Sequence, residues 1–466
     1  MDCRKVSRLK PALKAIVIGG GFAGLRAAVL LADQGIRVTL IEGRSSLGGR
    51  ARSFTDPATG QTVDNGQHLF LADYRETIRF LQRLGTNRHL IFQDHLKVTF
   101  VEPPGRSSTL DCPKLPSPWH LLVGMARLSS FTLSDKLKLG RLHREIHRAN
   151  RRCLDEESVE EWLNRMGQSR QSRLWFWHPL AVAALNEDPS TASAFGLVAV
   201  LDSLMRSPWP NARLGSSSIG LSDLYAEPAR RVIEEQGGEV LLNCFAAGLE
   251  MEGSQVTGVG LADGKSLRSD AVISALPPAA LLKIIPGGST AADSLRRNLS
   301  RFRTSPIVSI NLWLDRPVTQ ALFVGMIGTS TQWLFNKQAI LAPARVQADY
   351  LSLIISAAHS FIGRSNDELI SAALQGLRAC FPSAAQARLI RSQVVRERDA
   401  TVSLTVGMEK FRPGPATAFD NLFLAGDWTD TGLPATIESA VVSGRKSAEL
   451  LIKQVRAHCS ERESQY

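Results

Sequence analysis

The stretch KAIVIGGGFAGLRAAVLLADQGIRVTLIEG, which runs from Lys14 to Gly43, decides the fold of this chain. It begins with a short apolar run that ends in glycine, continues with helical periodicity over residues 25–32, and closes with a second apolar run over residues 38–41. Strand, glycine turn, helix and strand in this order predict a βαβ unit with two parallel strands.

The turn of this unit suits a dinucleotide. Gly19, Gly21 and Gly24 let the backbone turn tightly and approach a pyrophosphate. Phe22 and Ala23 open the helix, whose N-terminus offers unpaired N–H groups and the positive end of its dipole. The sequence therefore predicts a dinucleotide site, with a purely structural glycine turn as the alternative.

The second strand ends at Glu42, which Gly43 and Arg44 follow. A carboxylate at this point of a βαβ unit accepts hydrogen bonds from the ribose hydroxyls of a dinucleotide. Ribose and pyrophosphate are common to NAD and FAD, so this unit by itself leaves the dinucleotide open.

A second glycine motif, Gly48-Gly49-Arg50, distinguishes the two. Its glycines again allow a close backbone approach, and Arg50 brings a cation to a phosphate. With Glu42 before it, the motif resembles the FAD-dependent amine oxidase and carotenoid desaturase superfamily. That resemblance implies FAD as the cofactor, bound without covalent attachment.

The C-terminal residues 421–444, NLFLAGDWTDTGLPATIESAVVSG, are similar to the flavin motif of the same superfamily. A buried strand ends there at Gly426-Asp427, and a helix is predicted to open near Thr436 and Ile437. The resemblance implies that Asp427 binds the ribityl chain and that the helix points at the flavin ring, where its dipole favours negative charge.

The resemblance implies an α/β fold, with a Rossmann-type FAD-binding domain of the amine oxidase/glutathione reductase-like class and an inserted α+β substrate domain. It also places the adenine against the backbone of Ala246, within a β-meander predicted over residues 238–278. The two domains are expected to alternate along the chain: residues 1–85, 215–285 and 395–466 for the FAD-binding domain, and 86–214 (mostly helical) and 286–394 for the substrate domain.

Longer stretches are similar to one branch, the hydroxysqualene dehydroxylases, or squalene-associated FAD-dependent desaturases. They are TVDNGQHLFLADYRETIRFLQRLG (62–85), WHPLAVAALNEDPSTASA (177–194), GLSDLYAEPARRVIEEQGGEV (220–240) and AGDWTDTGLPATIESAVVSG (425–444). This resemblance implies reductive removal of a hydroxyl from hydroxysqualene, giving squalene in bacterial squalene and hopanoid biosynthesis. The hydride would come from flavin N5, and the electrons from a donor that the sequence does not identify.

Two alternatives remain open at this point. One is an oxidative carotenoid-type desaturase of a polyisoprenoid, because sequence does not set the direction of hydride transfer. The other is a non-catalytic prenyl-binding protein of the same fold, against which Glu42, Gly49, Arg50 and Asp427 argue, since a fold kept only for lipid would not need all four.

The sequence departs from amine oxidases at two places. Where those enzymes carry a lysine beside flavin N5 we place Ser309, on a strand predicted over residues 307–314, and where they frame the ring with tyrosines the chain has Ala435 and Thr436. Only four tyrosines occur in the chain. An aromatic cage for an ammonium substrate is therefore not expected.

A hydrophobic C30 isoprenoid substrate requires an apolar tunnel. Eight large apolar side chains form the predicted lining, although each alone is as well explained as ordinary core: Trp175, Phe176, Trp177, Leu180, Phe195, Leu197, Trp313 and Phe335.

Removal of the hydroxyl also requires an acid, because hydroxide is a poor leaving group. The polar candidates in the motif segments are Asp64, His68, Asp430 and Glu438. An imidazolium is an available acid near neutral pH, so His68 is the predicted proton donor and Asp64 its orienting partner. A histidine that only stabilises the domain interface is the alternative.

The 466-residue chain carries a net charge of +11. Part of this excess lies in SDKLKLGRLHREIHRANRR, residues 134–152, predicted as one basic amphipathic helix that is either a solvated face or a contact for anionic lipid. Nucleic-acid binding is not expected, because no such motif occurs and no aromatics interleave with the charges.

No metal is expected. His143 and His147 lack a third ligand, and the six cysteines form no Cys-x-x-Cys motif. With no apolar run of about 20 residues and no secretory leader, the sequence predicts a cytoplasmic protein, peripheral on the inner face of the cell membrane.

Overall fold

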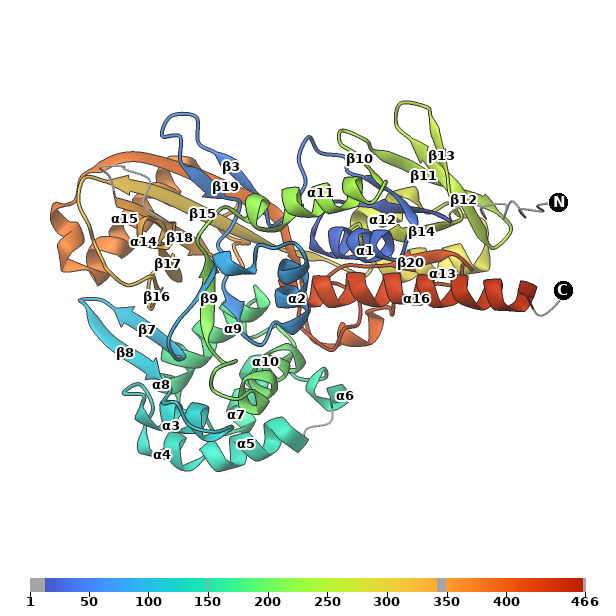
Figure 1. The fold of residues 1–466 in the computed structure, drawn as a ribbon. Helices are drawn as coiled ribbons and strands as arrows, with labels where there is room; N and C mark the ends of the chain where they lie inside the picture. The colour runs from blue at the N-terminus through green and yellow to red at the C-terminus, as the bar shows by residue number, and fades with distance from the viewer. Residues whose placement is uncertain (1–12, 149–150, 342–348, 464–466) are drawn as a thin grey trace, which may run out of the picture.

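The computed structural model describes residues 13–148, 151–341 and 349–463 (Figure 1). The predicted βαβ unit is present: β1 and β2 pair in parallel, with Lys14 opposite Arg37 and Ile18 opposite Ile41. We call the part built on this unit the βαβ domain and the remainder the second domain. Figure 1 shows the βαβ domain on the right and the second domain on the left and below.

The βαβ domain contains a five-stranded, all-parallel sheet in the order β10-β2-β1-β14-β20. Its strands come from all three chain segments that the sequence assigned to the FAD-binding domain. They are β1 (Lys14–Ile18), β2 (Arg37–Ile41), β10 (Glu239–Leu241), β14 (Ala271–Ser274) and β20 (Leu422–Leu424).

Both faces of this sheet are covered, as a parallel sheet requires. Ala15 and Val17 of β1 pack into a helical layer, whereas Ile16 and Ile18, which point the other way, pack against a β-meander and further helices. The helical layer consists of α1 (Phe22–Asp33), α2 (Arg75–Arg83), α11 (Glu227–Glu235) and α16 (Ile437–Glu463). The opposite layer consists of β11 (Ala246–Glu252), β12 (Gln255–Leu261), β13 (Ser266–Arg268), α12 (Pro278–Ile284) and α13 (Thr290–Leu299).

The second domain is built on a seven-stranded mixed sheet in the order β19-β15-β18-β17-β16-β7-β8. One face packs on a helix, through contacts such as Val308 with Leu369, and the other face turns toward the βαβ domain, where Trp313 packs with Val63. The elements are β7 (Lys97–Glu102), β8 (Arg106–Asp111), β15 (Thr304–Leu314), β16 (Phe323–Met326), β17 (Trp333–Asn336), α14 (Lys337–Ile340), β18 (Asp349–Ile355), α15 (Asn366–Cys380) and β19 (Leu389–Val402).

Helices fill the lower part of the second domain in Figure 1 and enclose its largest apolar cluster. They are α3 (Trp119–Arg127), α4 (Leu133–Leu137), α5 (Leu139–Arg148), α6 (Arg151–Leu154), α7 (Val159–Arg165), α8 (Arg170–Ser172), α9 (His178–Leu185) and α10 (Ala194–Arg206). No helix in the described ranges is both long and apolar enough to cross a bilayer.

The prediction of a single helix over residues 134–152 is wrong. The segment forms α4, α5 and the start of α6, and residues 149–150 lie outside the described part. Thr132 and Asp135 form a capping box at the start of α4, and at its end the ammonium of Lys138 donates to the carbonyl of Gly167 at 2.6 Å.

Two of the expected domain boundaries fall inside strands. The boundary between 394 and 395 interrupts β19, which pairs with β15 from Leu389 to Val402 and so extends the sheet of the second domain. The boundary between 214 and 215 lies within β9. Short strands connect the domains there and elsewhere: β3 (Ser53–Thr55), β4 (Thr62–Asp64), β5 (Phe70–Leu71), β6 (Leu90–Phe92) and β9 (Leu214–Ser217).

Candidate flavin site and adjoining cavity

The glycine turn between β1 and α1 leaves no room for side chains. Gly19 has φ +107°, and a Cβ on Gly24 would lie 1.9 Å from the carbonyl oxygen of Gly19. Gly21 is the N-cap of α1, with no side-chain cap and no acid in the first turn. The N–H groups of this turn, which contains Phe22 and Ala23, are therefore well placed for an anionic group.

Glu42 lies beside this turn. One carboxylate oxygen accepts a hydrogen bond from the Gly20 N–H at 2.7 Å and the other from the Arg44 N–H at 2.9 Å. Arg44 in turn donates to the carbonyl of Gly49 at 3.2 Å. The carboxylate thus joins the two glycine motifs, and its role toward ribose stays a prediction.

Phe245 is a neighbour that the sequence reasoning missed. A Cβ on Gly43 would lie 2.7 Å from its ring, so the absence of a side chain at Gly43 is what lets the ring lie there. The ring is 61% exposed, and Ala246, the predicted adenine contact, follows it at the start of β11. An exposed aromatic ring beside Glu42 offers a flat apolar face at the predicted nucleotide end.

The Gly-Gly-Arg and Gly-Asp motifs, far apart in sequence, are in contact. A nitrogen of the Arg50 guanidinium lies 2.6 Å from a carboxylate oxygen of Asp427, whose side chain is 8% exposed. Burial opposes the charge of Arg50, but Asp427 outweighs this effect and raises the pKa of the guanidinium. Gly48 and Gly49, with φ of +108° and +56°, bring the backbone close to this pair.

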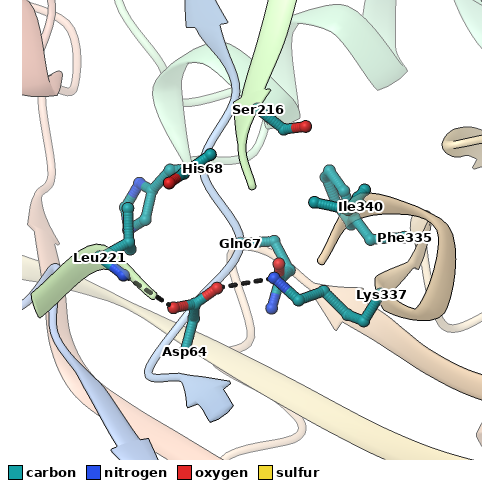
Figure 2. Close-up of a pocket in the computed structure, with 9 residues that line it drawn as sticks. Asp64, Gln67, His68, Ser216, Leu221, Phe335, Lys337 and Ile340 are labelled. Atoms are coloured by element: carbon teal, nitrogen blue, oxygen red, sulfur yellow. Dashed lines mark hydrogen bonds and ion pairs between the residues drawn. The ribbon is translucent and has the colours of Figure 1, made fainter. Parts of the chain in front are cut away.

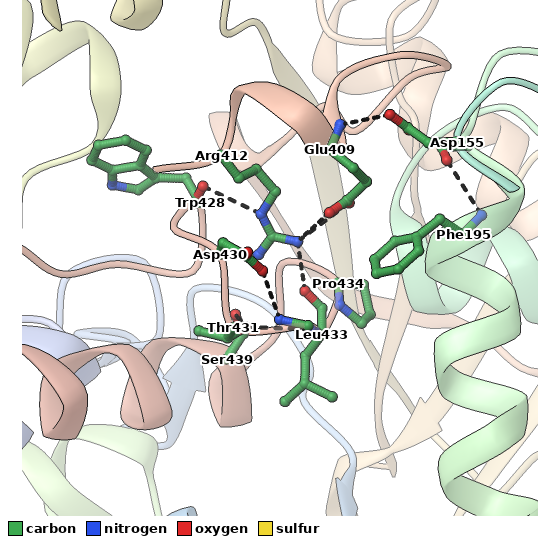
Figure 3. Close-up of polar contacts among 12 residues, drawn as sticks. Asp155, Phe195, Glu409, Arg412, Trp428, Asp430, Thr431, Leu433, Pro434 and Ser439 are labelled. Atoms are coloured by element: carbon green, nitrogen blue, oxygen red, sulfur yellow. Dashed lines mark hydrogen bonds and ion pairs between the residues drawn. The ribbon is translucent and has the colours of Figure 1, made fainter. Parts of the chain in front are cut away.

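Arg412, which the sequence reasoning also missed, stabilises the loop that carries Asp427 (Figure 3). Its fully buried guanidinium donates to the carbonyls of Asp427 at 2.9 Å, Thr429 at 2.7 Å and Leu433 at 2.7 Å. It also pairs with the Glu409 carboxylate at 3.1 Å. The only sign of Arg412 in the sequence is a lone arginine within FRPGP. Its partners are backbone carbonyls, which no sequence motif reveals.

The helix after this loop begins at Ile437, and Thr436 accepts a hydrogen bond from the Ser439 N–H at 3.2 Å. Glu438 points away from the cavity described below. Its carboxylate accepts hydrogen bonds from the Glu76 N–H at 3.0 Å, the Thr77 N–H at 2.9 Å and the Thr77 hydroxyl at 2.6 Å. All three donors belong to the N-terminus of α2, so the catalytic role of Glu438 stays a prediction that these partners disfavour.

Asp430 lies in the same loop as Asp427, between β20 and α16. It is exposed, and its carboxylate accepts a hydrogen bond from the Gly432 N–H at 3.1 Å. Figure 3 places it at the turn before Leu433. It does not line the cavity that holds the other two acid–base candidates.

That cavity, which is small, lies between the domains (Figure 2). Its polar wall comes from the segment after β4, from β9 and from the start of α14, and its apolar wall includes residues of the large helical cluster. The lining residues are Asp64, Gln67, His68, Ser216, Ser217, Leu221, Phe335, Lys337 and Ile340.

His68 lines the cavity but is poorly suited to the predicted role of imidazolium acid. Burial lowers its pKa to about 4; Asp64 opposes this shift, while Lys337 and Arg50 add to it. At neutral pH the ring is therefore neutral. The proton-donor prediction for His68 stays a prediction that its surroundings disfavour.

Lys337 is a charged cavity residue that the sequence reasoning did not find. Its side chain is 3% exposed, and its ammonium lies 2.7 Å from a carboxylate oxygen of Asp64. The other Asp64 oxygen accepts the Ser53 hydroxyl at 2.6 Å and the Leu221 N–H at 3.3 Å. A single charge inside the apolar run WLFNKQAIL was the available signal, since a buried lysine requires a partner.

The predicted tunnel lining divides into two groups. Trp175, Phe176, Trp177, Phe195, Leu197 and Phe335 belong to one buried cluster, with Leu180 packed against it. Trp313 instead stacks on Tyr350, with ring centroids 4.6 Å apart, in a separate cluster with Val63. The first group packs together in one cluster, as large apolar rings do when they bury their surface. Phe335 is the member of this group that lines the cavity.

A row of buried polar atoms lines the sheet face that is turned toward the βαβ domain. Asn311 of β15 is opposite Ser352 of β18, and Ser309 lies two residues before it on the same face. Within the described ranges, the Ser309 hydroxyl, the Asn311 amide nitrogen and the Ser352 hydroxyl are buried without hydrogen-bond partners. Buried polar atoms need partners, so these suit a polar ligand or ordered water.

Comparison with known proteins agrees with this geometry. The family model for flavin-containing amine oxidoreductases matches residues 22–452. The chain belongs to that family. Two hydroxysqualene dehydroxylases, from Sinorhizobium fredii and Rhodopseudomonas palustris, are each 31% identical to it, over 94% and 95% of this chain and 98% and 99% of theirs.

Other relatives are more distant. A 15-cis-phytoene desaturase from Synechococcus elongatus is 26% identical over 94% of this chain and 96% of its own. An oxidoreductase of known structure from Methanosarcina mazei shares the fold, with a TM-score of 0.73 and 16% identity over 94% of this chain and 100% of that one. By its family the protein is an FAD-dependent oxidoreductase of the hydroxysqualene dehydroxylase group.

The site fits FAD on its own geometry. The glycine turn and the uncapped N-terminus of α1 suit the pyrophosphate, and a Cβ on Gly444 would lie 2.1 Å from the Ala23 carbonyl oxygen, so α16 packs directly on α1. Arg50 pairs with Asp427, and its charge also lowers the pKa of His68, which lines the cavity.

Proposed function

We propose that the protein removes the hydroxyl group of hydroxysqualene reductively to form squalene, in bacterial squalene and hopanoid biosynthesis. The observation that carries this proposal is the similarity, over nearly the full length of both chains, to proteins named hydroxysqualene dehydroxylase. The reduced flavin supplies a hydride when bound. The chain itself binds the cofactor, orients the alcohol and protonates the leaving oxygen.

The cavity supports an alcohol substrate over a hydrocarbon. The buried pair of Lys337 and Asp64 carries a desolvation cost, which a site for a purely apolar chain would have no reason to bear. Phe335 joins this polar end to the aromatic cluster around Trp175 and Phe176, which suits an isoprenoid chain. The polar groups would hold the hydroxyl while the apolar ones receive the hydrocarbon.

The rival proposal is an oxidative desaturase, supported by the similarity to 15-cis-phytoene desaturase. One experiment separates the two. Purified protein, reconstituted with FAD and reduced with dithionite under anaerobic conditions, is mixed with hydroxysqualene, and the products are separated by gas chromatography. Squalene formed in proportion to reduced flavin supports dehydroxylation. No squalene, together with desaturation of phytoene when a quinone acceptor is present, supports the rival.

We also propose that the protein meets its substrate at an anionic membrane surface. Leu133 and Leu137, one turn apart on α4, are 73% and 78% exposed, and Trp119 of the nearby α3 is 59% exposed. Lys136 lies between the two leucines on the same short helix. Exposed apolar side chains flanked by basic ones are the composition that binds anionic lipid.

A further inference from the structure

The cation of the cavity is Lys337, at the junction of β17 and α14. Its ammonium has three N–H bonds, and Asp64 is its one hydrogen-bond partner among the residues that the structure describes. The Asp64 carboxylate is satisfied on both oxygens, by Lys337 on one and by Ser53 and Leu221 on the other. Asp64 therefore fixes the ammonium and leaves two N–H bonds for another acceptor.

A second donor in the cavity has no acceptor among the described residues. The amide nitrogen of Gln67 is buried with no hydrogen-bond acceptor within the described part of the chain. Figure 2 shows Gln67 beside Lys337, with Phe335 and Ile340 on the neighbouring wall. The unused N–H bonds of Lys337 and the amide of Gln67, beside apolar side chains, match an oxygen atom carried on a hydrocarbon.

The other acid–base candidates are less suited to donate a proton. His68 is neutral at neutral pH, because burial lowers its pKa to about 4. Glu438 accepts hydrogen bonds from the N-terminus of α2, and Asp430 lies outside the cavity. Among the residues that line the cavity, Lys337 is the one with an ammonium group, and an ion pair with Asp64 positions it there.

Resting on the proposed function, we infer that the ammonium of Lys337, positioned by Asp64, binds the hydroxyl oxygen of the substrate and protonates it as it leaves. The carbon–oxygen bond breaks, its electron pair stays on oxygen, and the proton from Nζ completes a water molecule. The allylic carbon receives the hydride that the reduced flavin supplies. The neutral amine then regains a proton from solvent.

The charges of the cavity explain why a lysine–aspartate pair suits this step. Before the step the charges are one positive on Lys337, one negative on Asp64 and none on the alcohol. While the bond breaks, Lys337 becomes neutral, Asp64 keeps its charge, and the positive charge moves to the allylic carbon. No net charge is created in a site that water penetrates poorly, where an uncompensated charge is costly.

Lys337→Met tests the inference in holoenzyme with full FAD occupancy. We expect flavin reoxidation by hydroxysqualene in a single turnover to slow 10²- to 10⁴-fold, the usual effect of losing a general acid. In the trifluoroacetate ester of hydroxysqualene, the leaving group is trifluoroacetate, which departs as a carboxylate without a proton. The rate of flavin reoxidation by this ester should therefore fall far less. Equal slowing with both substrates would mean a structural role and overturn the inference. So would an unchanged rate with the alcohol.

Three further variants complete the test. Lys337→Arg keeps the ion pair but holds its proton tightly, so it should stay slow with the alcohol, and a wild-type rate would overturn proton donation. If Lys337→Met alone fails to fold, the double variant Lys337→Met with Asp64→Asn takes its place, because it leaves no buried carboxylate without a partner. Lys283→Met, at an exposed position of α12, is the matched control. If wild-type protein forms no squalene, the proposed function fails instead.

Discussion

Replacing Arg412 by leucine should destabilise the loop that carries Asp427. The guanidinium is fully buried, donates to three backbone carbonyls at 2.7–2.9 Å and pairs with Glu409 at 3.1 Å. Leucine restores none of these bonds and leaves the Glu409 carboxylate buried without its cation. Removing one member of a buried ion pair costs about 3–5 kcal/mol, which is the expected loss in free energy of unfolding.

The loss should depend on pH. Burial raises the pKa of Glu409, and Arg412 opposes that rise. Without Arg412 the pKa rises further, so the folded variant binds a proton that the unfolded chain releases. The stability that such a group contributes to the protein is lost as pH rises through the pKa of the folded state. The variant should therefore be closer to wild type at about pH 5.5 than at about pH 8.

Urea unfolding followed by the fluorescence of released FAD measures both effects. Arg230→Leu on α11 is the matched control, because it removes an exposed arginine whose pair with Glu234 contributes about 0.3–0.5 kcal/mol. If Arg412→Leu lowers the free energy of unfolding no more than the control does, and keeps full FAD occupancy, then Arg412 does not stabilise the loop that carries Asp427. A loss that grows toward low pH would refute the role given to Glu409.

Three further predictions concern the cofactor, the cavity and the membrane. Asp427→Ala should weaken FAD retention by about 1.5–3 kcal/mol, seen by equilibrium dialysis, and acid precipitation of wild type should release free FAD; flavin that stays with the precipitate would contradict non-covalent binding. His68→Gln should retain FAD and keep a rate within about tenfold of wild type, since a neutral ring is not the acid; a larger loss in single turnover would restore His68 to that role. Leu133→Glu with Leu137→Glu should reduce co-sedimentation with anionic vesicles, and wild-type binding should fall as salt rises; binding unaffected by either would reject this surface.

The sequence was sufficient to predict features that are local in the chain or that belong to a known motif. The βαβ unit follows from apolar runs and glycines within residues 14–43, so no distant contact was needed. Arg50 and Asp427 were found by two separate motifs, although their contact is visible only in the fold. Pattern and motif therefore located the cofactor side of the site.

The substrate side depended on contacts that a sequence does not show. Lys337 pairs with Asp64 from a segment without a motif, and the sequence reasoning turned to His68 because a free imidazole titrates near neutral pH. Burial removes that property, and burial is a tertiary effect. The partner of Glu438 was hidden for a similar reason, because it is the N-terminus of a helix far away in the chain.

The order of strands in the sheet of the βαβ domain has a consequence for biosynthesis. β1 and α1 leave the ribosome well before β20 and α16, which complete the sheet and cover α1. About 400 residues separate them, so at 5–20 residues per second the nascent chain waits roughly 20–80 s with the apolar side of α1 uncovered. A chain that stops before β20 lacks Asp427, the partner of Arg50, and leaves the apolar side of α1 uncovered, so it is a fragment for chaperones and proteases rather than an apoenzyme.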